Sequence, residues 1–132
     1  RAADVACEFF SNPSKAAYET YGQVCLPLYS NPNVPAAGAF RDRAIERPEV
    51  AFHFFSDEMA QMDMRAEIAN ITCPTLVIGG AIDPVTPPIC SKAIADAIGD
   101  NARLRMFEGC GHGPHRDDPT GAEKIMRHFL AD

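Results

Sequence analysis

The fold is decided by the stretch PTLVIGGAIDP, residues 74–84, in which an apolar run ends in two glycines and a carboxylate follows. A second stretch, LRMFEGCGHGPH at residues 104–115, has the same plan with a histidine after the run. The residues at 75–78 do not alternate with polar ones, which is typical of a parallel strand buried on both faces. Residues 89–98 carry an apolar stripe at helical spacing, and Gly99 ends it. This order predicts a parallel crossover unit with strands at 75–78 and 103–107.

Asp83 and His112 follow the two predicted strands and are the acid and base half of a nucleophile–base–acid relay. Parallel sheets place their ligands at the carboxyl edge of the strands, so we expect the two side chains to meet there. The carboxylate would orient the imidazole, which can take up and return a proton near neutral pH. Taken alone, Asp-Pro favours a simple turn, and the pairing with His112 favours catalysis. His115 is the competing histidine, but its proline and arginine neighbours are less typical of a catalytic loop.

Composition argues against several classes of function. The chain has 132 residues, of which 46% are hydrophobic, enough for a real core. A net charge of −6, with lysines and arginines scattered singly, argues against a nucleic-acid partner. No apolar run is long enough to span a bilayer and the start does not resemble a signal peptide, so we expect no membrane partner. The five cysteines include no Cys-x-x-Cys pair, so we expect reduced thiols in a cytoplasmic protein, with no metal and no cofactor.

The first half of the chain is predicted to be helical, with Pro- and Asn-rich turns between the helices. Residues 2–9 share one apolar helical face, and Ser14 is the expected N-cap of the next helix, which Pro27 interrupts. A loop at 29–35 leads to two further helical segments, at 36–46 and 48–61. Pro48 suits the first turn of the latter. At the other end, residues 120–130 have the spacing of an amphipathic helix.

Two parallel strands buried on both faces are not a finished sheet, because their edges and apolar faces would be exposed to water. We therefore expect this chain to be the C-terminal piece of a larger α/β protein. The alternative is a small helical domain with a two-stranded ribbon.

The stretch ITCPTLVIGGAIDPVTP, residues 71–87, resembles the strand and acid loop of the α/β-hydrolase superfamily, and FEGCGHG at 107–113 resembles its last strand and histidine loop. Residues 54–59, 63–65 and 113–119 are similar to proline iminopeptidase-like members of that superfamily. The resemblance implies that residues 1–62 are a helical cap segment. It implies that residues 63–132 are the C-terminal part of the hydrolase core, with two parallel strands and flanking helices.

The same resemblance implies that Asp83 and His112 belong to a Ser-His-Asp triad. Acidic cap residues in proline iminopeptidase-like enzymes bind the free amino terminus of the substrate, which makes Glu58 a candidate substrate-binding residue. A solvent-facing helix carboxylate is the alternative for Glu58. Some of these enzymes carry an acidic residue directly after the catalytic acid, and this chain departs from that pattern with Pro84. The residues at 53–55 fit either an apolar substrate pocket or a core aromatic stripe.

The nucleophile is absent from the sequence. No Gly-x-Ser-x-Gly occurs, and no serine lies on a predicted strand-to-helix elbow. Cys110 stands beside His112, but the nucleophile of this fold approaches from another strand, so we interpret Cys110 as a small filler residue. We expect the N-terminal part of the same hydrolase, as a second chain or a missing segment, to supply the serine and the oxyanion hole.

These features favour the C-terminal part of a serine hydrolase, a proline iminopeptidase-like peptidase or amidase acting on a small molecule or short peptide. An esterase or lactonase on the same fold is the nearest alternative. A non-catalytic binding module is another, and it predicts that Asp83 and His112 lie beyond hydrogen-bonding reach of each other. A relative with an Asp nucleophile, such as an epoxide hydrolase or dehalogenase, is a further alternative.

Overall fold

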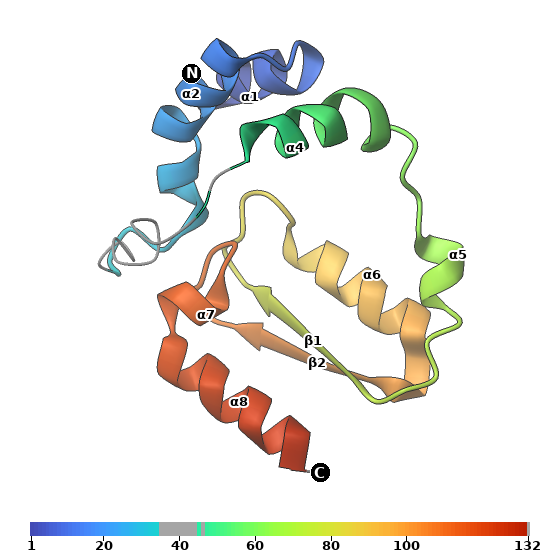
Figure 1. Ribbon diagram of the computed structural model, residues 1–132. Helices are drawn as coiled ribbons and strands as arrows, with labels where there is room; N and C mark the ends of the chain where they lie inside the picture. The colour runs from blue at the N-terminus through green and yellow to red at the C-terminus, as the bar shows by residue number, and fades with distance from the viewer. Residues whose placement is uncertain (35–44, 46, 132) are drawn as a thin grey trace. The chain divides into compact units, whose positions relative to one another are not determined.

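The computed structural model describes residues 1–34, 45 and 47–131 (Figure 1). The chain divides into two compact units, one of Arg1–Leu28 with Pro35–Asp63 and one of Tyr29–Val34 with Met64–Asp132. The elements of the described residues are α1 (Ala2–Ser11), α2 (Lys15–Val24), the 3₁₀-helix η1 (Leu26–Tyr29), α4 (Pro48–His53), the π-helix η2 (Phe54–Glu58), α5 (Arg65–Ile68), β1 (Thr75–Gly80), α6 (Pro88–Ile98), the 3₁₀-helix η3 (Gly99–Asn101), β2 (Ala102–Phe107), α7 (Pro114–Asp117) and α8 (Pro119–Ala131).

The first unit is built around aromatic side chains from its helices. Phe9 of α1 is fully buried, and its ring lies 4.9 Å from that of Tyr21 in α2. The ring of Phe55 in η2 packs edge-on against Phe9 at 5.2 Å and against Phe10 at 5.1 Å. Tilted and edge-on ring pairs at these distances add to the stability that burial provides. The position of Phe55 in this cluster agrees with the core-stripe interpretation of residues 53–55.

The helix boundaries of this unit follow the sequence signals. Ser14 is the N-cap of α2, and its side chain accepts the N–H of Ala17 at 3.2 Å. Pro48 begins α4, as its missing N–H and fixed φ favour. The helix predicted at 48–61 continues as a π-helix and ends at Glu58. The helix predicted at 36–46 falls on residues that, except for Ile45, lie outside the described part of the chain.

The second unit contains the two parallel strands. They pair in register from Thr75 with Ala102 to Gly80 with Phe107. Helices α6 and α8 lie on opposite sides of the strands (Figure 1). Gly99 ends α6 at a φ of +73°, a conformation that glycine adopts without strain. The predicted α/β class, with two parallel strands and flanking helices, is confirmed.

The two strands differ in burial, so the prediction that both are buried on both faces holds for β1 and is wrong for β2. Every residue of β1 is buried or half-buried, as predicted. In β2 the side chains alternate, with Arg103 and Arg105 exposed, so this strand is not buried on both faces. Long side chains can cover apolar neighbours while their charged ends remain in water. The guanidinium of Arg103 lies 5.8 Å from the ring centre of Phe129 in α8.

Among the helices of the described residues, none has the length and hydrophobicity that crossing a bilayer requires.

Beyond the strands, the two following loops stay in backbone contact. The N–H of Ala81 donates to the carbonyl of Phe107 at 3.0 Å, and that of Ile82 to the carbonyl of Cys110 at 3.1 Å. A Cβ at Gly80 would collide with the carbonyl oxygens of Cys110 and Gly111. Gly80 therefore allows an approach between the loops that no larger residue permits.

We expect Gly80→Ala to destabilise the protein by about 1–3 kcal/mol, because the added methyl group must displace backbone rather than a mobile side chain. Urea unfolding followed by circular dichroism measures the change. Gly22→Ala in α2 is the matched control, since its Cβ would meet only Leu26 at an ordinary 3.8 Å. The control should stabilise the helix by about 0.5–1 kcal/mol. Unchanged stability of Gly80→Ala would contradict the described contact between the loops.

Candidate active site

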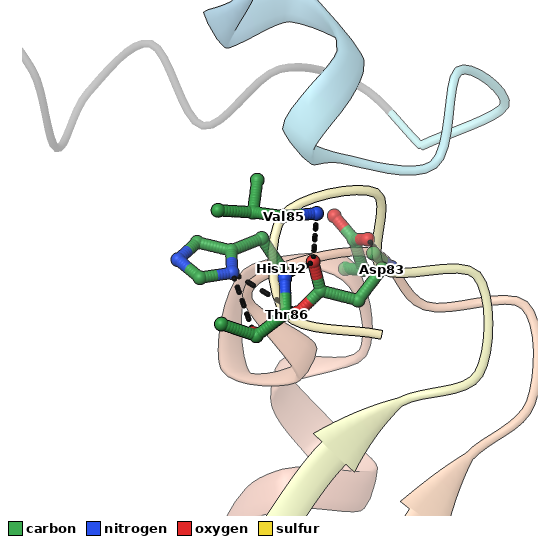
Figure 2. A network of polar contacts seen from close by, with 6 residues as sticks. Asp83, Val85, Thr86 and His112 are labelled. Atoms are coloured by element: carbon green, nitrogen blue, oxygen red, sulfur yellow. Dashed lines mark hydrogen bonds and ion pairs between the residues drawn. The ribbon is translucent and has the colours of Figure 1, made fainter. Parts of the chain in front are cut away.

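The acid loop begins directly after β1 and is organised by the carboxylate of Asp83 (Figure 2). Oδ1 of Asp83 accepts the N–H groups of Val85 at 2.8 Å and Thr86 at 3.0 Å. Oδ2 accepts the hydroxyl of Thr86 at 2.8 Å. Aspartate favours such turns because its side chain bonds the backbone two and three residues ahead. These bonds fix the orientation of the Asp83 side chain, which is only 5% exposed.

The surroundings of Asp83 stabilise its charged form. Burial by itself would raise the pKa of this carboxyl. The backbone and hydroxyl donors of Thr86, the N–H of Val85 and the ring of His112 together outweigh burial and lower the pKa below the ordinary aspartate value. Asp83 is thus a carboxylate, and it can only accept hydrogen bonds.

His112 lies in the loop after β2, where Gly109 turns the backbone with a φ of +71°. Nδ1 of His112 donates to Oδ2 of Asp83 at 3.0 Å, and the hydroxyl oxygen of Thr86 lies 3.3 Å from the same nitrogen. The ring of Tyr29 packs edge-on against the imidazole, with ring centres 5.0 Å apart. The structure thus brings together the acid and histidine that the sequence singled out.

The charge of Asp83 decides the tautomer of His112. A carboxylate offers no proton, so Nδ1 must carry the hydrogen of the Asp83–His112 bond. Nε2 then holds a lone pair on the side of the ring away from Asp83 (Figure 2). No hydrogen bond to Nε2 is formed within the described residues, and the imidazole is 34% exposed. This arrangement can act as a general base toward a group that approaches Nε2.

Glu58, the predicted substrate-binding residue, lies in the other unit. Its Oε1 is 2.8 Å from Nε2 of His53, and Oδ2 of Asp57 is 3.4 Å from Nδ1 of the same ring. Glu58 and Asp57 are both exposed. The π-helical turn explains the cluster, because it places residues five apart on one side of the helix.

Two other residues considered from the sequence are less suited to catalysis. His115 is exposed on α7 and is not in the Asp83–His112 pair. The thiol of Cys110 is buried, and burial, followed by the charges of Asp117 and Asp118, raises its pKa. A thiol with a raised pKa is a poor nucleophile, because the thiolate is the reactive form. These contacts agree with the interpretation of Cys110 as a filler residue.

Three residues of the site were not predicted from the sequence. Thr86 binds both members of the pair, and its place three residues after Asp83 is a local turn signal that could have identified it. Tyr29 contacts His112, and Asp117 binds the backbone beside it. Tyr29 is distant from His112 in the sequence, and no short sequence motif predicts the contact between them. No group of three or more His, Cys, Asp or Glu side chains within the described ranges is arranged to hold a metal ion.

We expect Thr86→Val to raise the pKa of Asp83 toward the ordinary aspartate value, because the variant removes a donor while burial remains. Titration of the Asp83 carboxyl carbon by ¹³C NMR measures this shift. Thr86→Ser keeps the hydroxyl and should leave the midpoint near that of the unaltered protein. Equal midpoints in Thr86→Val and Thr86→Ser would show that the hydroxyl does not stabilise the charge.

The chain is similar in sequence to several curated proteins over about half of its length. The chain is 39% identical over 62 residues to BpoC of Mycobacterium tuberculosis, assigned as a non-heme bromoperoxidase, with 47% of this chain and 23% of that protein covered. It is 35% identical over 69 residues to RutD of Pseudomonas syringae, assigned as a carbamate hydrolase, with 52% and 26% covered. It is 29% identical over 72 residues to the pimeloyl-[acyl-carrier protein] methyl ester esterase of Aromatoleum aromaticum, with 54% and 28% covered.

The fold is also that of solved hydrolases. An α/β-fold hydrolase from Bacillus anthracis superimposes with a TM-score of 0.70 at 15% identity, over 98% of this chain and 47% of that one. The chain thus spans about half of this structure, and its matched segments span about a quarter of the curated relatives. The family model of the TAP-like proteins matches residues 56–132. The chain therefore belongs to the TAP-like family of α/β-hydrolases.

Proposed function

We propose that this chain supplies the acid and the histidine of a serine hydrolase. The observation that carries the proposal is the 3.0 Å hydrogen bond from Nδ1 of His112 to Oδ2 of Asp83. The carboxylate is buried and charged, so it orients the ring and stabilises the imidazolium that forms during the reaction. The alternative of a non-catalytic binding module predicts that the two side chains are out of reach of each other, and the hydrogen bond favours the enzyme.

In this mechanism Nε2 of His112 takes the proton of a serine hydroxyl while the serine oxygen attacks a substrate carbonyl. The imidazolium then returns the proton to the leaving group. In the second half of the reaction, Nε2 takes a proton from water, which attacks the acyl-enzyme. The bond between the acyl group and the serine oxygen then breaks, and the imidazolium returns the proton to that oxygen as the acid product leaves. Thr86 cannot replace the serine, because its hydroxyl lies on the Nδ1 side of the ring.

The serine and the oxyanion hole would come from the N-terminal part of the same hydrolase, as a second chain or a further segment. The lack of any Gly-x-Ser-x-Gly in this sequence supports this assignment. Apolar side chains on the helices that flank the strands support it as well. Ile89 of α6 is 73% exposed, and Leu130 of α8 is 81% exposed. A partner that covers such side chains would remove apolar surface from water.

The substrate would be a small molecule or short peptide with an ester or amide bond. Two relatives are named for a carbamate and a methyl ester, which supports hydrolysis of small acyl compounds. Proline iminopeptidase-like activity is the second candidate. The carboxylates of Glu58 and Asp57 favour it, since they could bind the free amino terminus of a peptide. A cytoplasmic location belongs to the same proposal, and the five free cysteines support it.

We expect His112→Ala to lower kcat about 10⁶-fold, because the general base is lost. The assay is hydrolysis of an aryl ester by this chain together with the part that carries the nucleophile. His115→Ala is the matched control, three residues away and exposed, and it should keep the unaltered rate. A fluorophosphonate probe should label the nucleophile-bearing part alone, and full activity of His112→Ala would refute the proposal.

Rates on N-terminal prolyl amides and aryl esters decide between the two candidate activities. If the substrate amine binds Glu58, Glu58→Gln should reduce kcat/KM for the prolyl amide about tenfold, since a charge-assisted hydrogen bond is lost. Hydrolysis of the aryl ester should not change. Glu49→Gln, which alters an exposed carboxylate of α4, is the control. Equal loss on both substrates, or none on the amide, would exclude this role of Glu58.

A further inference from the structure

Asp117 is a buried carboxylate that the proposed reaction does not use. It is the last residue of α7 and is 8% exposed. Its Oδ2 accepts the N–H of Gly111 at 2.7 Å and the N–H of Asn31 at 2.9 Å. One oxygen thus binds the residue next to His112 and a segment 86 positions earlier in the sequence. A buried carboxylate needs such donors, since a charge without partners is costly away from water.

The segment at 29–31 contacts the histidine loop at two further points. The carbonyl of Tyr29 accepts the N–H of His112 at 2.6 Å, and Nδ2 of Asn31 donates to the carbonyl of Gly109 at 2.5 Å. A Cβ at Gly111 would collide with the carbonyl of Tyr29, so the two backbones approach closely. We refer to Tyr29, Asn31 and Asp117 as the histidine clamp.

We propose that Asp117 is a positioning residue that holds the histidine loop, so that Nδ1 of His112 remains on Asp83 and Nε2 faces the nucleophile. The proposal rests on the proposed function. The clamp binds the backbone at three of the four residues 109–112, while among the described residues the ring itself is contacted at Nδ1 and by the ring of Tyr29. A loop free to shift would carry the imidazole with it. Misplacing a catalytic group by about 1 Å can reduce the rate about 100-fold.

A carboxylate suits this role better than a neutral group. It only accepts hydrogen bonds, and charge-assisted bonds are about twice as strong as neutral ones. Asp117→Asn keeps the shape and one acceptor oxygen but removes the charge, so the clamp should weaken while the fold persists. Asp118→Asn is the matched control, because the adjacent carboxylate is exposed and accepts the N–H of Gly121 in α8 instead.

The test measures amide hydrogen exchange by NMR and steady-state kinetics on an aryl ester, with the nucleophile-bearing part present. In Asp117→Asn we expect exchange at Gly111 and Asn31 to become about tenfold faster. Exchange in β1 and β2 should stay as it was. We expect kcat to decrease between about tenfold and 100-fold with KM unchanged, since the loss concerns the placement of the base. Asp118→Asn should alter neither kcat nor exchange at Gly111.

Unchanged kcat in Asp117→Asn, or unchanged exchange at Gly111, would overturn the inference. If this variant does not fold, the coupling across the hydrogen bond between the Gly111 nitrogen and the Asp117 carboxyl carbon is measured in the unaltered protein. Asn31→Ala then replaces it in the kinetics. A missing coupling would overturn the role of Asp117. An unaltered kcat of Asn31→Ala, which removes the side-chain bond to Gly109 and leaves the backbone bond to Asp117, would overturn the role of Asn31 in the clamp. If Asp117→Asn keeps the unaltered rate and His112→Ala is inactive, only the clamp is refuted. If His112→Ala is active, the proposed function is refuted.

Discussion

The close approach of two loops at Gly80 is the contact on which the site depends. Strands β1 and β2 run in parallel and end at the same edge, so the loops that follow them leave the sheet together. Without a side chain at Gly80, the acid loop lies directly against the carbonyls of Cys110 and Gly111. Asp83 and His112 are three and one residues beyond these contacts. Their 3.0 Å hydrogen bond is therefore the consequence of a backbone arrangement that the glycines permit.

Two buried carboxylates support His112, one by binding its ring and the other by binding the backbone beside it. Asp83 binds the imidazole directly, and its charge is stabilised by donors from its own turn. Asp117 binds backbone N–H groups on both sides of a contact between distant segments. Both are supplied with donors, which is the condition for a charge to remain buried. Asp83 accepts N–H groups of its own turn and the ring of His112, whereas Asp117 accepts one N–H from the histidine loop and one from a segment 86 positions earlier.

The two units of the chain have cores of different kinds. Helices with a cluster of aromatic rings form the first unit, and a parallel strand pair with helices on both sides forms the second. The second unit alone contains the acid, the histidine and the clamp, including the short segment Tyr29–Val34 that it takes from the first half of the sequence. The strands hold the ends of the acid and histidine loops in place, and hydrogen bonds between the loops hold the rest of each loop.

The strand–helix–strand order, the cap at Ser14 and the pairing of an acid with a histidine could be predicted from the sequence, because each depends on neighbouring residues or on the edge that parallel strands share. The sequence-based prediction overestimated the burial of β2, because Arg103 and Arg105 are exposed there and the guanidinium of Arg103 lies over the ring of Phe129. The roles of Tyr29, Asn31 and Asp117 could be recognised from the three-dimensional contacts alone. The hydrogen bonds that Asn31 makes to Asp117 and Gly109 join positions about 80 residues apart, and no local pattern encodes which distant backbone a buried carboxylate will meet.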